Sequence, residues 1–327
     1  MADKILRWGL LSTARINARL IPPLNASKRN RLVAVASRNQ ATADAYAREW
    51  KIPRALGSYE ALLTDPEIDV IYNPLPNSLH AEWTVRALRA GKHVLCEKPM
   101  ALSLAEMDEI KAASQGTRRV VMEAFMYRHH PQTLKVKELV DSGSLGKLQL
   151  VRASFTFVLT HEGDVRLDKA LGGGSIWDLG CYPISYARTM IGAEPLEVFG
   201  WQVTGSTGID MSFIGQMRFA NDVHAQFDCG FASPEHAFVE IVGTEGTLNI
   251  PVPFLPEKKE KIYLTHGKKT DTIEIKGQEL YIGEVEDMAD AILLGKPLRV
   301  SLEDSRINTA TILALLKSAQ SGKAMAL

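Results

Sequence analysis

The chain has 327 residues, of which 46% are hydrophobic, and its formal net charge at pH 7 is +0. Because this length exceeds what one ordinary core needs, we expect two domains, residues 1–125 and 126–327. The neutral balance excludes the basic surface that nucleic acids or anionic membranes require, and no apolar run reaches the roughly 18 residues of a membrane span. With no signal-peptide pattern after Met1, we expect a cytoplasmic protein whose partner is a small molecule.

Short apolar runs alternate with amphipathic stretches in the first domain, which is typical of βαβ units on a parallel sheet. Strands are expected at residues 5–11, 32–37, 70–72, 93–96 and 120–124. Helices are expected over residues 42–47 and 83–90, and a third follows Ser103, where Glu106 completes a capping box. This order predicts an α/β fold with a doubly wound parallel sheet, the Rossmann arrangement.

The turn after the first strand, residues 9–16, has the spacing of a dinucleotide-binding turn. Such a site needs a tight turn, a small residue beside the pyrophosphate and a small residue where helix meets strand. We expect Gly9, Ser12 and Ala14 to meet these needs, although serine and alanine replace the more permissive glycine. An ordinary strand-to-helix turn is the alternative.

The end of the second strand indicates which nucleotide is preferred. A carboxylate at this point accepts from the ribose 2′-hydroxyl of NAD, whereas NADP needs a cation there. The chain has no acid here but reads Ser37-Arg38-Asn39, and a guanidinium can fork onto a 2′-phosphate while Ser37 donates to it. We therefore expect NADP rather than NAD, the alternative being that Arg38 is a solvated loop residue.

Two later strand ends complete the expected crevice. The loop from Asn73 to His80 contains two prolines that stiffen it against the nicotinamide ribose, and we expect His80 to open a helix, the alternative to a role at the site being an ordinary helix-end histidine. After the strand at residues 93–96 comes Glu97-Lys98-Pro99, where Pro99 stops the strand and holds Lys98 on a stiff turn. Ligands of open α/β sheets bind outside such carboxyl ends, so Lys98 points to chemistry rather than to a solvated lysine.

Glycines 172–174 are expected to form a flexible loop against a ligand, followed by a helix from Ile176. On that helix Asp178 and Tyr182 are four residues apart and share a face. If this face meets the nicotinamide, both side chains converge with Lys98 on one substrate hydroxyl. Tyrosine is a poor base at neutral pH unless a cation lowers its pKa, so we expect Tyr182 as acid/base and Lys98 as that cation. The two roles can be exchanged, and an amphipathic helix with Tyr182 against a core is the alternative.

The second domain contains short β-rich runs separated by turn residues. Strands of one sheet are expected at residues 148–156, 198–203, 213–219, 223–229 and 237–242, with turns at 221–222 and Gly246. Helices are expected at residues 284–294, ended by Gly295, and at 302–319. We expect residues 251–261 to be a solvated loop.

A metal mechanism is not expected. His161 and Glu162 lack the second histidine of a metalloprotease helix, and His129-His130 has no third ligand in view. The three cysteines are scattered without a CxxC spacing, so we expect buried thiols rather than disulfides or zinc ligands. Arg128 and Arg166 are weaker candidates for contacts with substrate hydroxyls, their alternative being surface arginines.

The ordered set of motifs resembles the Gfo/Idh/MocA family of oxidoreductases over nearly the whole chain. The matching segments are Glu97-Lys98-Pro99, the loop ending in His80, Glu123 to Arg128, the glycines at 172–174, Asp178 to Tyr182, residues 192–195 and residues 243–247. Tyr182, where many members carry histidine, and the run from Glu123 make the chain most similar to the dimeric dihydrodiol dehydrogenase and NADP-dependent xylose dehydrogenase branch.

The resemblance implies an enzyme that moves hydride between a nicotinamide and the hydroxyl carbon of an aldose, cyclic polyol or dihydrodiol. It implies a second domain with a large, open, mostly antiparallel sheet, one face of which packs in a homodimer or a higher homo-oligomer. The expected catalytic residues are Lys98, Tyr182, Asp178 and His80. The expected cofactor contacts are Gly9, Ser12, Thr13, Ala14, Arg15, Ile16, Ser37, Arg38, Asn73, Pro74, Leu75, Asn77, His80, Glu97, Lys98 and Met126.

Two other functions stay open. In one, the protein keeps its dinucleotide bound and runs a closed redox cycle, as a sugar-sugar oxidoreductase or an NAD-dependent glycosidase. In the other, it is a non-catalytic sugar or dinucleotide sensor like relatives that lost the lysine, and the presence of Lys98 argues against this.

Overall fold

The computed structural model describes residues 4–161 and 163–327, so the expectations placed on Met1 and Glu162 lie outside the described residues. The chain divides into two compact units, Met1–Met126 with Tyr281–Ser305, and Tyr127–Leu280 with Arg306–Leu327. The expected second domain, residues 126–327, includes a segment that the structure groups with the first unit. No helix in the described part of the chain is long and apolar enough to cross a bilayer.

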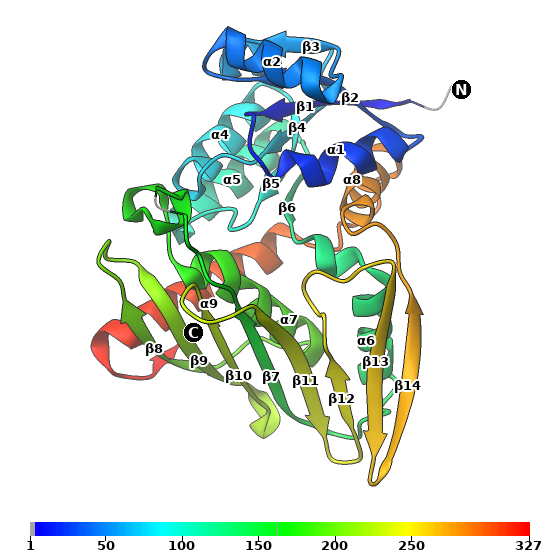
Figure 1. Cartoon of the computed structure of the whole chain (residues 1–327), viewed down its shortest axis with the longest axis vertical. Coiled ribbons are helices and arrows are strands. Elements are labelled where there is room, and N and C mark those ends of the chain that lie inside the picture. The colour runs from blue at the N-terminus through cyan, green and yellow to red at the C-terminus, as the bar shows by residue number, and fades with distance from the viewer. Residues whose placement is uncertain (1–3, 162) are drawn as a thin grey trace. The chain divides into compact units, whose positions relative to one another are not determined.

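The first unit is built on a six-stranded parallel sheet of order β3-β2-β1-β4-β5-β6 (Figure 1). Its strands are β1 (Leu6–Leu11), β2 (Asn30–Ala36), β3 (Arg54–Leu56), β4 (Val70–Asn73), β5 (His93–Glu97) and β6 (Val121–Ala124). Its helices are α1 (Asn17–Ala26), α2 (Gln40–Trp50), α3 (Tyr59–Thr64), α4 (Asn77–Arg89), α5 (Leu104–Thr117) and α8 (Ile282–Leu294). The order reverses between β1 and β4, the switch point where open α/β sheets bind dinucleotides.

The predicted doubly wound sheet is therefore confirmed, and the five expected strands lie within two residues of their predicted bounds. The capping of α5 is also confirmed with one variation. Ser103 Oγ accepts from the Glu106 N–H at 3.2 Å, while the Glu106 carboxylate accepts from Leu102 N–H at 2.8 Å instead of from Ser103. Strand β3 was not predicted, because its three residues are only partly buried and lack an apolar run.

Helix α8 belongs to the first unit because it is bound to the segment between α1 and β2. Arg29 forms ion pairs with Glu286 and with Asp290, the latter at 2.5 Å, and Ser27 Oγ donates to Glu286 at 2.6 Å. Figure 1 shows α8, in orange, beside the dark blue α1. These contacts join residues more than 250 positions apart, which no local sequence pattern reveals.

The second unit is built on a nine-stranded sheet of order β14-β13-β12-β11-β7-β10-β9-β8-β15. Its strands are β7 (Leu148–Thr156), β8 (Glu197–Thr204), β9 (Asp210–Arg218), β10 (His224–Gly230), β11 (His236–Gly243), β12 (Thr247–Ile250), β13 (Lys259–His266), β14 (Lys269–Lys276) and β15 (Met325–Ala326). The pairing is antiparallel except between β7 and β10, which confirms the mostly antiparallel sheet.

Helices α6 (Pro131–Asp141), α7 (Cys181–Ile191) and α9 (Leu302–Ser321) lie behind this sheet in Figure 1. Helix α9 approaches strand β8 closely at Gly200, where an added Cβ would lie 3.2 Å from the Leu315 carbonyl of α9. The opposite face carries no helix in this view. The β9–β10 hairpin turns at Asn221 and Asp222, both with φ of 58°, so the expected turn is confirmed.

One expectation for this unit is confirmed only in part. Residues 251–258 form a loop, but it is anchored rather than fully solvated, because Phe254 is fully buried and its ring packs on Phe155 at a centroid distance of 4.9 Å. The lysine-rich end of the segment enters β13, whose alternating pattern buries Ile262 and Leu264. The charged residues lie on the exposed face of β13. The apolar residues alone do not predict this strand.

Candidate functional site

The turn after β1 is centred on Ser12, not on Gly9. Ser12 has φ of 137°, a conformation that favours glycine, directly before the residues that lead into α1. Gly9 lies inside β1, where an added Cβ would be 2.9 Å from Leu62 Cδ1 and 3.1 Å from Ile68 Cδ1. The expected tight-turn role of Gly9 is thus corrected, since this glycine lets α3 pack against the sheet.

Counted from Ser12, the dinucleotide fingerprint becomes Ser12-x-Ala14-x-x-Asn17, with Thr13, Arg15 and Ile16 between these positions. Asn17 is fully buried and its amide donates to the Ser12 carbonyl at 2.9 Å. The hydroxyl of Ser12 is buried without a hydrogen-bond partner in the turn between β1 and α1. This turn fits an anionic nucleotide, and the spacing from Ser12 is the signal by which Asn17 could have been predicted.

The end of β2 presents Ser37, which is buried, and Arg38, which is exposed. Burial raises the pKa of the nearby Tyr59, and the positive charge of Arg38 opposes this shift. Asn39 is occupied in capping α2, where its side chain accepts from Thr42 N–H at 3.1 Å. A serine and an exposed arginine at this strand end fit a nucleotide that carries a phosphate on its ribose.

The loop after β4 is held by a fully buried Asn73. Its amide donates to the His80 carbonyl at 3.1 Å and to Thr84 Oγ at 3.2 Å, and its oxygen accepts from Leu75 N–H at 3.4 Å. Asn73 therefore fixes the loop of Pro74 and Leu75 against the start of α4 at Asn77. Contacts of these four residues, and of the buried Met126, with a cofactor stay predictions.

His80 lies in the first turn of α4 and locks the Lys98 turn. Its Nδ1 donates to the Pro99 carbonyl at 2.7 Å. Burial lowers the pKa of His80 to about 4, and the charge of Lys98 adds to this shift while the hydrogen bond to the Pro99 carbonyl opposes it. The imidazole is therefore neutral near pH 7.

Three further contacts fix the same turn. The Tyr72 hydroxyl donates to Glu97 Oε1 at 2.5 Å, and burial together with the Glu97 charge raises the pKa of Tyr72 well above its usual value. Glu97 Oε2 accepts from the Lys98 N–H at 3.3 Å, and the Lys98–Pro99 peptide is cis. Beyond it, Met100 N–H donates to the Glu123 carboxylate at 2.9 Å. Lys98 thus stands on a turn held on both sides by buried partners.

The helix that carries Asp178 and Tyr182 does start at Ile176, but its first turn is wider than expected. Ile176–Gly180 is a π-helical turn that continues into α7. Pro183 has no N–H for the Leu179 carbonyl, and its ring would collide with that oxygen in a regular α-helix, which favours the wider turn. A separation of four residues still spans about one turn here.

Tyr182 is 5% exposed and belongs to an aromatic cluster. Its ring centroid lies 5.4 Å from that of Phe155 and 5.7 Å from those of Tyr127 and Phe254. The neighbouring Arg128 is buried and donates to Ser185 Oγ at 3.1 Å, so the surface-arginine alternative is wrong for it. This cluster is compatible with both interpretations of Tyr182, as a residue packed on a core and as the acid/base of the reaction.

Asp178 is paired with Arg166, whose Nη1 lies 3.4 Å from Asp178 Oδ2. The same guanidinium forks onto the buried Asp164, with Nε–Oδ1 at 2.9 Å and Nη2–Oδ2 at 3.0 Å. The hydrogen bonds that Arg166 donates to the Asp164 carboxylate raise the pKa of Arg166. Arg166 therefore pairs with two carboxylates of the protein, Asp164 and Asp178. The sequence suggested a contact with a substrate hydroxyl instead.

The glycines at 172–174 do not form the flexible loop that we expected. An added Cβ on Gly173 would lie 2.4 Å from the Arg166 carbonyl. Gly174 has φ of 133°, and its Cβ would lie 2.3 Å from Asp210 Oδ1. These glycines are required because the loop packs tightly on itself and on β9.

The described residues contain no group of three or more His, Cys, Asp or Glu side chains arranged to hold a metal ion. Cys96, Cys181 and Cys229 are free and buried, as expected.

Comparison with known proteins identifies the family. Residues 6–125 match the family described as "Oxidoreductase family, NAD-binding Rossmann fold", and residues 133–249 match the "GFO/IDH/MocA C-terminal domain". The chain is 37% identical to D-xylose 1-dehydrogenase (NADP(+)) 2 of Haloferax volcanii, over 98% of this chain and 100% of that protein. It is 35% identical to trans-1,2-dihydrobenzene-1,2-diol dehydrogenase of Danio rerio, over 75% of this chain and 74% of that protein.

Among solved structures, the aldose-aldose oxidoreductase from Caulobacter crescentus, complexed with glycerol, superposes with a TM-score of 0.92 at 26% identity. The match covers 99% of this chain and 100% of that one. The two curated relatives belong to the branch that the motifs indicated. With both family matches and these likenesses along the chain, the protein belongs to the Gfo/Idh/MocA family of oxidoreductases.

Proposed function

We propose that this oxidoreductase is an NADP-dependent dehydrogenase acting on the hydroxyl or carbonyl carbon of an aldose, a cyclic polyol or a dihydrodiol. The observation that carries the proposal is the Lys98 turn at the carboxyl end of β5, held by His80, Tyr72 and Glu123. A turn fixed from three sides keeps one cation at the sheet edge where this fold class binds its ligands. Pre-organised charge of this kind is what a reacting hydroxyl requires.

Four side chains receive roles in this proposal. Tyr182 takes the hydroxyl proton during oxidation and returns it during reduction, and Lys98 binds the substrate oxygen and lowers the pKa of Tyr182. Asp178, held by Arg166, orients the substrate hydroxyl, and His80 supports Lys98 through the Pro99 carbonyl. A bound nicotinamide supplies the hydride acceptor or donor. Exchange of the Lys98 and Tyr182 roles is the alternative assignment.

The preference for NADP rests on Ser37 and Arg38 at an acid-free end of β2. Arg38 has no carboxylate beside it in the sequence from Ala36 to Asn39, so it can meet a 2′-phosphate. The similarity to a xylose dehydrogenase named for NADP(+) supports the same assignment. The turn from Ser12 to Ile16 would then hold the pyrophosphate through the start of α1.

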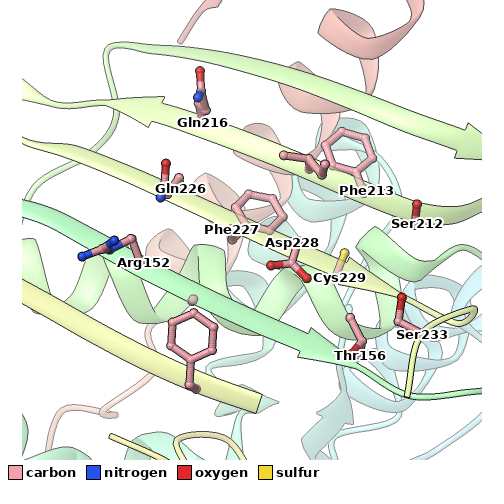
Figure 2. Close-up of a pocket in the computed structure, with 13 residues that line it drawn as sticks. Arg152, Thr156, Ser212, Phe213, Gln216, Gln226, Phe227, Asp228, Cys229 and Ser233 are labelled. Carbon is pink, nitrogen blue, oxygen red and sulfur yellow. The ribbon is translucent and has the colours of Figure 1, made fainter. Parts of the chain in front are cut away.

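We also propose that the enzyme is a homodimer joined through the helix-free face of the nine-stranded sheet. Trp201, Val203 and Ile214 are 54%, 64% and 52% exposed on adjacent strands of this face. Figure 2 shows Arg152, Gln226 and Gln216 on three neighbouring strands of the sheet. These residues line a hollow of about 470 Å³. A broad face that mixes large apolar and polar side chains suits a two-fold interface.

A substrate panel tests the proposed function. Aldoses, inositols and dihydrodiols are each incubated with NADP or NAD, and the nicotinamide absorbance is followed. We expect reduction of NADP by at least one class, faster than reduction of NAD at equal low concentration. If no member of the panel reduces either nucleotide, and the corresponding ketones or lactones do not oxidise NADPH, the proposal is wrong.

A second candidate is a closed redox cycle in which the dinucleotide stays bound. The likeness to an aldose-aldose oxidoreductase along the whole chain favours it. Mass spectrometry of freshly purified, denatured protein separates the two functions. Stoichiometric nicotinamide dinucleotide supports the closed cycle, whereas its absence supports a dehydrogenase that exchanges cofactor at each turnover.

A further inference from the structure

Asp210, the first residue of β9, lies beneath the start of the helix that carries Asp178 and Tyr182. It is 5% exposed. Its Oδ2 accepts from Ser175 Oγ at 2.6 Å and from the Ile176 N–H at 2.7 Å. One buried side chain thus accepts from two donors of the first residues of the helical segment.

The same carboxylate fixes the loop before the helix. Gly174 passes so close to Asp210 Oδ1 that an added Cβ would be 2.3 Å away, and the Gly174 carbonyl accepts from Asp178 N–H at 3.1 Å. Further along, an added Cβ on Gly180 would lie 3.0 Å from Cys229 Sγ of β10. The π turn is therefore clamped to two strands, at one end through Asp210 and at the other through Gly180.

The electrostatics of this clamp depend on the charge of Asp210. Burial raises the pKa of Asp210 to about 6, and hydrogen bonds from Ser175 and Ile176 oppose the shift. The titratable group that faces it from β10 is Cys229, whose thiol pKa is raised by burial and by the Asp210 charge. The carboxylate also faces the N-terminal end of a helical segment, where negative charge is stabilised.

We propose that Asp210 is a positioning residue of the reaction, which sets the placement of Asp178 and Tyr182 by holding Ser175 and Ile176. This inference rests on the proposed roles of Asp178 and Tyr182. Asp178 lies two residues after Ile176, and Tyr182 follows through one π turn, so a shift at the clamp is passed to both. A misplacement of about 1 Å can lower a rate by about a hundredfold.

Asp210→Asn tests the proposal because it keeps the size of the side chain but removes the negative charge, so that Ser175 and Ile176 donate to a neutral amide oxygen, a weaker acceptor than a carboxylate. We expect kcat to fall about a hundredfold, while the Kd for NADPH, measured by its fluorescence, is unchanged. In the wild type, kcat should rise as pH increases through about 6, where Asp210 ionises, and this acid limb should be absent from the variant.

The matched control is Asp228→Asn. Asp228 lies on β10 and accepts from Ser154 Oγ at 2.8 Å, but alternation places it on the opposite face of the sheet. Its kcat and acid limb should equal those of the wild type. Ser175→Ala removes one donor to Asp210 with less disturbance, and we expect its kcat to fall about tenfold.

The outcomes separate this inference from the proposed function. If Asp210→Asn lowers the melting temperature but keeps the wild-type kcat and acid limb, Asp210 is only structural and the inference is wrong. If Asp210→Asn does not fold, a Ser175→Ala enzyme with wild-type kcat overturns the inference instead. Loss of the proposed function is recognised separately, by wild-type kcat in Tyr182→Phe and Asp178→Asn.

Discussion

The ring of His80 and the carbonyl of Pro99 are joined by a hydrogen bond of 2.7 Å that ties the start of α4 to the turn after β5. The bond needs a proton on Nδ1, and the pKa of about 4 that burial imposes on His80 leaves Nε2 unprotonated and the ring neutral near pH 7. His80 therefore holds the Lys98 turn in place without adding a second positive charge beside Lys98.

This burial predicts a pH-dependent stability. Between pH 6.5 and about 4 the unfolded chain protonates His80 while the folded protein does not, so stability falls as pH falls through this window. The full difference corresponds to about 3 kcal/mol. The melting temperature of His80→Asn should therefore fall less steeply with decreasing pH than that of the wild type.

Other groups among the described residues also affect stability as the pH falls, and His130, whose pKa is lowered by burial, acts in the same direction as His80. His93, with a pKa lowered to about 4 mainly by burial, acts in the same direction as His80. Asp210, with a pKa raised to about 6, acts in the opposite direction because its folded form binds a proton first. All three are present in the wild type and in the variant, so their effects cancel in the difference. An identical pH slope in the two proteins would show that His80 is not buried as a neutral ring.

Tyr72→Phe should destabilise the protein because it removes the hydroxyl that donates to Glu97 at 2.5 Å. Loss of a hydrogen bond to a charged group costs about 1.5–3 kcal/mol, measured as the free energy of unfolding in urea. Tyr186→Phe is the matched control, since the buried Tyr186 hydroxyl has no hydrogen-bond partner. Equal stability of the two variants would contradict a stabilising Tyr72–Glu97 bond.

Arg38→Ala should narrow the preference for NADP over NAD. Loss of a charge-assisted contact to the 2′-phosphate should weaken NADP binding by roughly tenfold to a hundredfold, whereas NAD binding should change little. The measurement is kcat/KM for each nucleotide in the wild type and the variant. Faster turnover of the wild type with NAD at equal low concentration would refute the assignment.

The dimer proposal predicts the effect of a charge on the sheet face. Ile214→Lys places a cation opposite Trp201 on the adjacent strand, at a position that is 52% exposed. Because the side chain already reaches solvent in a single chain, the fold should tolerate the change. Light scattering at micromolar concentration should give a dimer mass for the wild type and a monomer mass for Ile214→Lys. A monomeric wild type would refute the interface.

The first unit could be predicted because buried parallel strands such as β4 appear as continuous apolar runs. Strand β14 was missed because its residues, Lys269–Lys276, are mostly exposed and polar at the edge of the sheet. The grouping of Tyr281–Ser305 with the first unit could not be predicted, because its partner Arg29 lies far away in the chain.

The same reasoning applies to the candidate site. Lys98 stands in a local motif and could be proposed from it, and Asp178 and Tyr182 from their spacing. The roles of Tyr72 and Asp210 could not be predicted. Tyr72 donates to Glu97, 25 positions away, and Asp210 accepts from Ser175, 35 positions away, so no local pattern reveals either contact. The fingerprint was placed three residues early because Gly9 is the only glycine there, although the unusual conformation is that of Ser12.

The central claim is that Tyr182, assisted by Lys98, carries the proton of the substrate hydroxyl. The most direct measurement is kcat for oxidation as a function of pH, in the wild type and in Tyr182→Phe, with a substrate identified by the panel. Lys98→Ala is measured alongside and should be at least as impaired.

We expect the wild-type kcat to rise with pH through an apparent pKa below the value of about 10 for free tyrosine. In Tyr182→Phe this limb should vanish and kcat should fall about a hundredfold to ten-thousandfold, with NADPH binding nearly unchanged. A Tyr182→Phe enzyme with near-normal kcat and the same pH limb would contradict the claim and assign the proton to Lys98 or to water.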